Sequence, residues 1–284
     1  MNGTFSLESA HQQVVERIHR ACVAAGRPPD AVQLLAVSKT RSPDEVAALA
    51  ALGPHAMGEN YLQEALDKQQ ALAGLGLQWH FIGPIQSNKT RRIAEHFDWV
   101  HSVESLRIAR RLSDQRPGGL APLNICLQVN VSGEDSKSGC APEEALALAL
   151  AIAPLPGLQL RGLMAIPEPT DDEAVQRMRF GRLRQLHDEI RAALAASVDA
   201  AGVPGTAAPA PSPSTDGNDP HAIVPGAAEA AALAARFDTL SMGMSDDLEA
   251  AIAAGSTMVR IGTALFGPRP PKAASSIGDT DAAA

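Results

Sequence analysis

Short apolar runs alternate with longer stretches of helical periodicity along most of the chain. The stretch 7–25 has apolar positions at helical spacing, and the runs that follow it contain few polar residues. Strands that are apolar throughout, rather than at every second position, are typical of a parallel sheet covered by helices. The runs that we expect to form strands are 32–38, 55–58, 79–83, 99–102, 124–131, 158–164, 239–242 and 258–262.

Signals for helix starts lie between these runs. The segment 42–45 (SPDE) combines an N-cap serine, a proline at the first helical position and a capping-box glutamate. The segment 170–173 has a similar box, and Ser245 is followed by aspartates that suit a helix N-terminus. About eight strand–helix units in ~250 residues match an α/β fold, a single TIM (β/α)8 barrel with an N-terminal helix. The same periodicity also fits a doubly wound open sheet, which stays as the alternative.

One internal segment, 200–225, does not follow this pattern. It is rich in Pro, Ala, Gly and Ser and has no apolar period, which is typical of a flexible insertion. The residues 270–284 have a similar composition, and we expect them to form a disordered tail. The sequence therefore predicts one barrel over 1–269 that is interrupted by the insertion.

Composition narrows the classes of function. The 284 residues are 45% apolar and 20% charged, with a net charge of −8, which argues against general electrostatic binding of DNA or an anionic membrane. No apolar run of roughly 18 residues predicts a membrane span, and the N-terminus lacks the pattern of a signal peptide. Cys22, Cys126 and Cys140 have neither disulfide nor metal-ligand spacing, so we expect free thiols, no metal and a cytoplasmic location.

The unusual residues follow the ends of the predicted strands, where TIM barrels carry their chemistry. The first is Lys39, at the end of the apolar segment LLAVSKT (34–40). A lysine in this position either extends its amine to solvent or, when desolvated in the barrel mouth, forms a Schiff base with an aldehyde. Spacing alone leaves both interpretations open.

The last two predicted strands are followed by residues suited to a phosphate. The segments SMGMS, which begins at Ser241, and Gly262-Thr263 place small residues and hydroxyls before helix starts, where backbone N–H groups favour an anion. Arg260 lies in an apolar run and needs a partner, either a structural carboxylate or a ring nitrogen of a cofactor. A lysine for an aldehyde, a phosphate cradle and an arginine for a pyridine nitrogen together describe pyridoxal 5′-phosphate.

Several long motifs resemble one known family, the YggS/PROSC family of pyridoxal phosphate homeostasis proteins. The similar segments are, in order, AVSKT, GENYLQE, WHFIGPIQSNK, QVNVSGEDSKSG, LRGLMAIP and LSMGMSDDLEAAIAAGSTMVRIGTALFG. The resemblance covers residues 7–269 outside the insertion. It implies a barrel like that of alanine racemase, with pyridoxal 5′-phosphate bound to a lysine.

The resemblance also implies a set of site residues and a function. The residues that it assigns are Lys39 for the Schiff base, Ser241, Gly262 and Thr263 for the phosphate, Arg260 for the pyridine nitrogen, and Asn60 beside the cofactor. An arginine disfavours protonation of the pyridine nitrogen, so the ring is a weaker electron sink. We therefore expect a carrier or buffer of the cofactor that is not an enzyme, with apo-enzymes that use the cofactor as candidate partners.

Two other classes of function stay open. A racemase or Schiff-base lyase needs a second proton-transfer group, for which His80 and Lys137 are candidates, whereas Tyr61 is expected to pack at a helix start. An RNA- or protein-binding module is suggested by NKTRR (88–92), although an aromatic content of 3% is low for a nucleic-acid site. We expect a monomer, because each predicted element has a partner for its apolar face.

Overall fold

The computed structural model describes residues 5–133, 138–196 and 227–268. The expected insertion 200–225 and the expected tail 270–284 lie outside these described residues. Within the described parts, no helix is long and apolar enough to cross a lipid bilayer.

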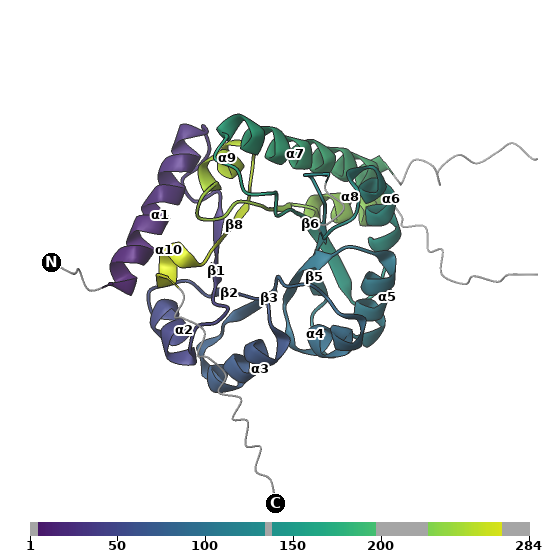
Figure 1. Cartoon of the computed structure of the whole chain (residues 1–284). Coiled ribbons are helices and arrows are strands. Elements are labelled where there is room, and N and C mark those ends of the chain that lie inside the picture. Colours follow the sequence, from purple (N-terminus) through teal and green to yellow (C-terminus); the bar gives the residue numbers. More distant parts are fainter. Residues whose placement is uncertain (1–4, 134–137, 197–226, 269–284) are drawn as a thin grey trace, which may run out of the picture.

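Parallel strands form the centre of the molecule. They are β1 (Gln33–Val37), β2 (Ala56–Glu59), β3 (Gln78–Phe81), β4 (Trp99–Val103), β5 (Leu123–Gln128), β6 (Leu158–Met164), β7 (Thr239–Ser241) and β8 (Met258–Ile261). Each strand pairs with the next one, and β8 pairs with β1 to close the barrel (Figure 1). This closure confirms the predicted TIM barrel and excludes the open sheet. Several strands end earlier than the apolar runs, and the residues that follow form loops at the carboxyl end of the barrel.

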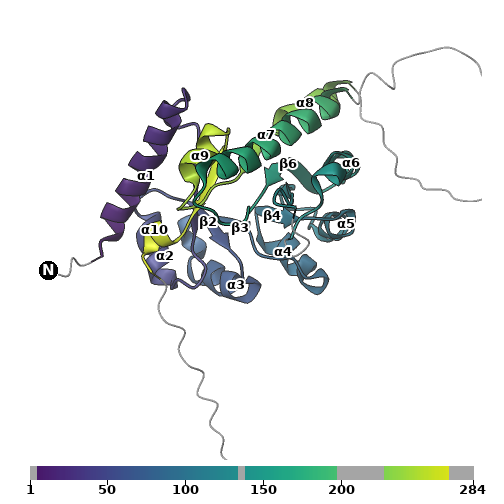
Figure 2. The same cartoon turned by 45° about the horizontal axis from the view of Figure 1, so that its top comes forward.

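Helices surround the strands and connect them (Figures 1 and 2). They are α1 (Leu7–Ala24), α2 (Pro43–Ala50), α3 (Leu62–Ala71), α4 (Thr90–His96), α5 (Leu106–Gln115), α6 (Pro142–Ile152), α7 (Glu173–Ala196), α8 (Ala227–Arg236), α9 (Leu248–Ala253) and α10 (Thr263–Phe266), with short 3-10 turns η1 (Ala73–Leu75) and η2 (Ser87–Lys89). The N-terminal helix α1 is confirmed, and it packs against α2, α9 and α10, which flank the closure of the barrel.

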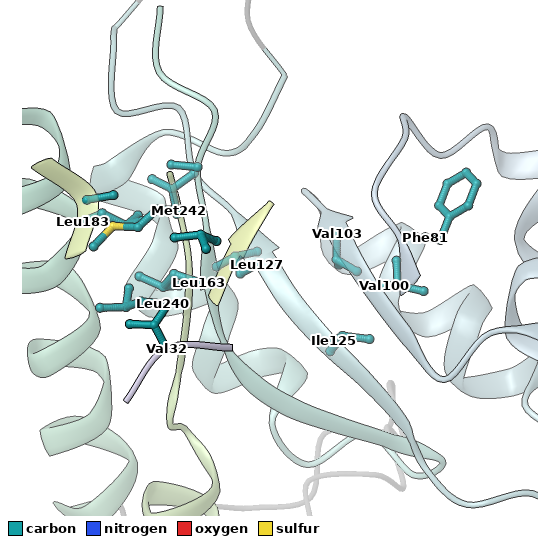
Figure 3. Packing of buried hydrophobic residues seen from close by; sticks show 14 of the residues in the cluster. Val32, Phe81, Val100, Val103, Ile125, Leu127, Leu163, Leu183, Leu240 and Met242 are labelled. Atoms are coloured by element: carbon teal, nitrogen blue, oxygen red, sulfur yellow. The ribbon is translucent and has the colours of Figure 1, made fainter. Parts of the chain in front are cut away.

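Most of the apolar core lies between the strands and the helices. Figure 3 shows part of this layer, which includes Leu163 and Leu240 from strands and Leu183 from α7. Inside the barrel, smaller apolar clusters form around Leu35 and around Trp99. The interior also holds polar side chains that are at most 4% exposed, namely His80, His101, Ser241 and Arg260. Buried polar groups of this kind need hydrogen-bond partners, which the next section describes.

Of the three predicted helix starts, the one at 42–45 is confirmed and the other two differ from the structure in detail. The capping box is confirmed, because the Ser42 hydroxyl accepts from the Glu45 N–H and the Glu45 carboxylate accepts from the Ser42 N–H. The expected box over 170–173 is wrong in detail. The carboxylate of Asp172 accepts from the N–H of Ala174, and the helix begins after the threonine that was expected to cap it.

The third start signal also differs from the prediction. Helix α9 begins at Leu248, so Ser245 stays in the preceding loop. The carboxylate of Asp247 accepts from the Met244 N–H at 2.6 Å and stabilises this loop instead of capping the helix with its side chain. The loop between β7 and α9 therefore carries Ser245 at the mouth of the barrel.

Candidate functional site

A cavity of about 500 Å³ lies at the carboxyl ends of the barrel strands. Its lining includes Lys39, Asn60, Arg260, Gly262 and Thr263, five of the six site residues predicted from the sequence. Because β1 pairs with β8 at the closure of the barrel, residues from opposite ends of the chain meet in this wall. The structure thus brings the lysine, the arginine and the last glycine–threonine pair together.

Arg260 is buried, with 4% of its surface exposed, although it lines the cavity. Its Nη1 donates to the carbonyl and the hydroxyl of Ser241 at 2.5 and 2.8 Å, and its Nη2 donates to the Ala165 carbonyl at 2.9 Å. Burial lowers the pKa of Arg260 to about 10, partly opposed by Asp247. The guanidinium therefore stays protonated at neutral pH, held by neutral acceptors.

Behind Arg260, a chain of hydrogen bonds crosses the barrel interior. Ser241 Oγ lies 2.8 Å from His101 Nδ1, His101 Nε2 lies 2.9 Å from His80 Nδ1, and His80 Nε2 lies 3.0 Å from Gln78 Oε1. Since Gln78 Oε1 can only accept, His80 Nε2 carries a proton and, in a neutral ring, its Nδ1 accepts from His101. By the same reasoning, His101 Nδ1 accepts from the Ser241 hydroxyl.

Both imidazoles in this chain are neutral at physiological pH. Burial lowers the pKa of His80 to about 3. Burial, with His80 and Arg260 nearby, keeps the pKa of His101 well below its ordinary value. Every hydrogen bond from Arg260 to Gln78 therefore runs in one direction, which fixes the orientation of the guanidinium.

Ser241 is the one predicted site residue that does not line the cavity. It is fully buried, and its hydroxyl donates to His101 and accepts from Arg260. Ser245, the last residue of the predicted phosphate motif SMGMS and an expected helix cap, lines the cavity instead. The motif SMGMS thus contributes one serine to the interior of the barrel and one to the cavity wall.

Sequence reasoning missed Arg17, which reaches the cavity from the N-terminal helix α1. Its guanidinium makes a bidentate ion pair with Glu249 at 2.5 and 2.6 Å, and its Nη1 donates to the Ser245 carbonyl at 2.6 Å. Glu249 holds the pKa of Arg17 above its ordinary value. In the sequence, Arg17 reads as an ordinary polar residue of an amphipathic helix, so only the fold reveals its contact with the cavity loop.

Asn60 carries the observation that fits a bound cofactor best. Its Oδ1 is buried and has no hydrogen-bond partner within the protein. Buried polar atoms are nearly always paired, so an acceptor without a partner, in a residue that lines the cavity, needs a donor from outside the protein. An amine, a guanidinium and a hydroxyl line the same cavity, through Lys39, Arg260 and Thr263. These three donors fit a ligand that offers acceptors, such as an aldehyde, a phosphate and a ring nitrogen.

The other residues considered from the sequence lie elsewhere. His80 is a buried interior histidine rather than a cavity residue. Tyr61 stands at the start of α3 as expected, but it is 58% exposed and is not a packing residue. It lines a neighbouring cavity with Lys89 and Arg92 of the NKTRR segment. Lys137 lies outside the described residues.

The fold of this chain is that of a known class of barrel, the N-terminal domain of alanine racemase. Residues 15–215 match the family described as "Alanine racemase, N-terminal domain". PipY of Synechococcus elongatus PCC7942, whose structure was solved with PLP bound, superposes with a TM-score of 0.66 and 31% identity, over 89% of this chain and 100% of PipY.

Similar proteins of known name identify the family within this class more narrowly. The chain is 55% identical over 257 residues to the pyridoxal phosphate homeostasis protein of Pseudomonas aeruginosa, covering 90% of this chain and 93% of the relative. It is 47% identical over 260 residues to the protein of the same name from Escherichia coli K12, covering 90% and 94%. The chain belongs to the pyridoxal phosphate homeostasis protein family, as its motifs predicted.

Proposed function

We propose that this chain binds pyridoxal 5′-phosphate in the cavity through a Schiff base on Lys39 and holds it for use by other proteins. One observation carries the proposal, namely that Lys39, Arg260 and Asn60, whose Oδ1 has no partner within the protein, line one cavity. The names of the relatives and the PLP bound in PipY support the choice of ligand.

Each cavity residue has a distinct role in this proposal. The bound cofactor supplies an aldehyde that reacts with amines, and Lys39 provides the amine. The backbone N–H groups at Gly262 and Thr263 and the Thr263 hydroxyl bind the phosphate. Ser241, assigned to the phosphate from the sequence, acts from behind the wall in this proposal because its hydroxyl is bound to His101 and Arg260.

Arg260 favours storage of the cofactor over catalysis. A protonated guanidinium donates to the ring nitrogen and disfavours protonation of that nitrogen, so the ring withdraws fewer electrons. His80, the histidine considered as a second proton-transfer group, is buried in the interior with a lowered pKa. The chain would therefore capture and release the aldehyde without processing an amino acid, delivering it in the cytoplasm, as a monomer, to apo-enzymes.

Borohydride reduction tests the attachment directly. We expect a protein incubated with PLP to absorb in the visible region, and reduction to leave a stable adduct that peptide mapping places on Lys39. Lys39→Ala should give no adduct at that peptide. An adduct on another lysine, or none in the wild-type chain, contradicts the proposal.

The storage role has its own test. The loaded protein is mixed with an apo-enzyme, and recovery of activity is compared with recovery from free PLP at the same concentration, with and without a scavenger of free aldehyde. Transfer that persists with the scavenger supports delivery. Racemisation or elimination of amino acids that is lost in Lys39→Ala would instead support the racemase or lyase alternative.

A further inference from the structure

A buried cluster of charges lies beside the cavity and has no role in the proposal above. Its centre is Lys68 of α3, which is 2% exposed. Lys68 Nζ donates to the Ser38 carbonyl at 2.6 Å, to Glu59 Oε1 at 2.7 Å and to Glu64 Oε1 at 2.6 Å. An ammonium has three N–H donors, so all of them are used.

The acceptors in this cluster hold the residues on both sides of Lys39. On one side, Ser38 offers its carbonyl to Lys68, and its hydroxyl donates to Glu59 Oε1 at 2.6 Å. On the other side, the Thr40 N–H donates to Glu64 Oε1 at 2.5 Å. The backbone before and after Lys39 is therefore tied to one ammonium, either directly or through a carboxylate.

Thr40 adopts an unusual backbone conformation. Its φ is +67°, and among the described residues it is the one non-glycine with a positive φ. The left-handed region is unfavourable for a β-branched residue, and such strain persists only where the surroundings impose it. The Thr40 N–H is held in this conformation by its hydrogen bond to Glu64. The turn brings the chain from β1 to α2 while Lys39 lines the cavity.

Stability alone is a poor explanation for this cluster. Glu59 is fully buried, its Oε2 has no partner, and burial raises its pKa against the opposing effect of Lys68. Desolvating a buried ion pair often offsets what the pair contributes, and apolar residues of similar size would stabilise a fold as well. A rigid network that holds both neighbours of the reactive lysine has a functional explanation instead.

We propose that Lys68, with Glu59 and Glu64, is a positioning centre that directs the Lys39 amine toward the aldehyde of a phosphorylated pyridoxal ligand. This inference rests on the proposed function. The cluster does not touch the ligand; it acts by fixing the Ser38–Thr40 backbone. A small misplacement of a reacting group lowers the rate of bond formation far more than it lowers binding of the rest of the ligand.

The test separates bond formation from binding. The rate of imine formation with PLP is followed by absorbance, and affinity is measured with pyridoxine 5′-phosphate, which carries an alcohol in place of the aldehyde. Glu64→Gln keeps an acceptor for the Thr40 N–H but removes the charge that pairs with Lys68. Thr40→Gly makes the backbone of this turn more flexible. Thr40→Asn keeps the left-handed conformation of the turn, because asparagine tolerates a positive φ.

We expect Glu64→Gln and Thr40→Gly to slow imine formation by about 10- to 100-fold and to change the affinity for pyridoxine 5′-phosphate less than twofold. Thr40→Asn should react close to the wild-type rate. The matched control is Glu173→Gln, which removes an ion pair of the same i,i+4 spacing, Glu173–Arg177, on α7. Lys68→Met removes all three hydrogen bonds of the centre and should slow imine formation at least as much.

The outcomes distinguish the two proposals. A wild-type chain that binds pyridoxine 5′-phosphate but forms no imine overturns both of them. A wild-type chain that forms the imine, with Glu64→Gln and Thr40→Gly reacting equally fast, overturns only the positioning role. Equal losses of rate and of analogue affinity would indicate general damage to the cavity, and would also contradict positioning.

Discussion

At the scale of single residues, Arg260 and its partners explain how a charge is kept inside a barrel. Its N–H groups donate to two backbone carbonyls and to a serine hydroxyl. That hydroxyl donates to His101, and His101 donates to His80, so both neutral histidines belong to one chain of hydrogen bonds. The sequence predicted that Arg260 needs a partner, and the two partners considered were a carboxylate and a ring nitrogen of a cofactor. The fold instead provides neutral acceptors from β7 and from Ala165, the residue after β6, which no local pattern reveals.

Replacing Arg260 with glutamine should weaken cofactor binding. The variant keeps a donor but loses the charge, and a hydrogen bond to a charged group contributes about 1.5–3 kcal/mol, so affinity should fall roughly 10- to 100-fold. The visible absorbance of the bound form should also shift, because the ring nitrogen loses its charged neighbour. Titration with PLP checks both effects, and an unchanged spectrum and affinity would place the ring nitrogen elsewhere.

Acid should destabilise the fold through the interior histidines. The pKa of His80 is about 3 in the folded chain, against 6.5 as its ordinary value. The unfolded chain therefore binds a proton that the folded chain does not between these pH values, and the free energy of unfolding falls as pH falls through this window. The slope per histidine is about 1.4 kcal/mol per pH unit.

The variant His80→Gln should show a shallower dependence on acid. Glutamine can accept from His101 and donate to Gln78 without titrating. Urea unfolding at several pH values between 4 and 7 measures the slope for each protein. Parallel curves for the variant and the wild type would mean that His80 titrates alike in the folded and unfolded states.

At the scale of elements, the loop after β3 holds Asn60 in place. A Cβ on Gly83 would lie 2.2 Å from the Asn60 carbonyl oxygen, so only glycine allows the two segments to approach this closely. The motif GENY at the end of β2 and the glycine after β3 are both visible in the sequence. Their contact is not, because it depends on the register between β2 and β3.

Gly83→Ala should therefore displace Asn60 and lower the affinity for PLP by about tenfold or more, with a loss of stability of about 1–3 kcal/mol. Gly74→Ala is the matched control, because a Cβ there meets nothing within 4 Å. Binding titrations and thermal unfolding of both variants provide the comparison. If the two variants bind PLP equally well, Asn60 has no part in binding.

Alternation of elements along the chain was the most predictable part of this molecule. Apolar runs identified each strand, because buried parallel strands consist mostly of apolar residues, and one capping box was correct in its hydrogen bonds. The start of α9 was misplaced, because the Asp247 carboxylate binds the backbone of its own loop instead of capping the helix with its side chain. Choices of this kind depend on the tertiary path of the loop.

At the scale of the whole molecule, α1 acts on the site from outside the barrel. Arg17 joins α1 to Glu249 of α9 and to the Ser245 carbonyl in the cavity wall. Its ion pair is partly exposed, with side-chain exposures of 33% and 51%, so its contribution to stability is small. Its main effect should be on the order of the loop that carries Ser245.

Arg17→Met should consequently leave the thermal midpoint nearly unchanged while speeding release of PLP. Release is measured by dilution of the loaded protein into a scavenger of free aldehyde. Arg177→Met, which removes an exposed ion pair on α7, is the control. A release rate equal to that of the control would show that α1 is only a structural cover.

The junction of β1 with β8 has a consequence for biosynthesis. The amine that we assign to cofactor capture lies at residue 39, and the guanidinium and the glycine–threonine pair lie at 260–263. A ribosome releases these two halves of the cavity at opposite ends of translation, since chains emerge from the N-terminus onward. A nascent polypeptide would thus expose Lys39 long before it could hold the vitamer. Binding of the vitamer would therefore show that β8 has paired with β1.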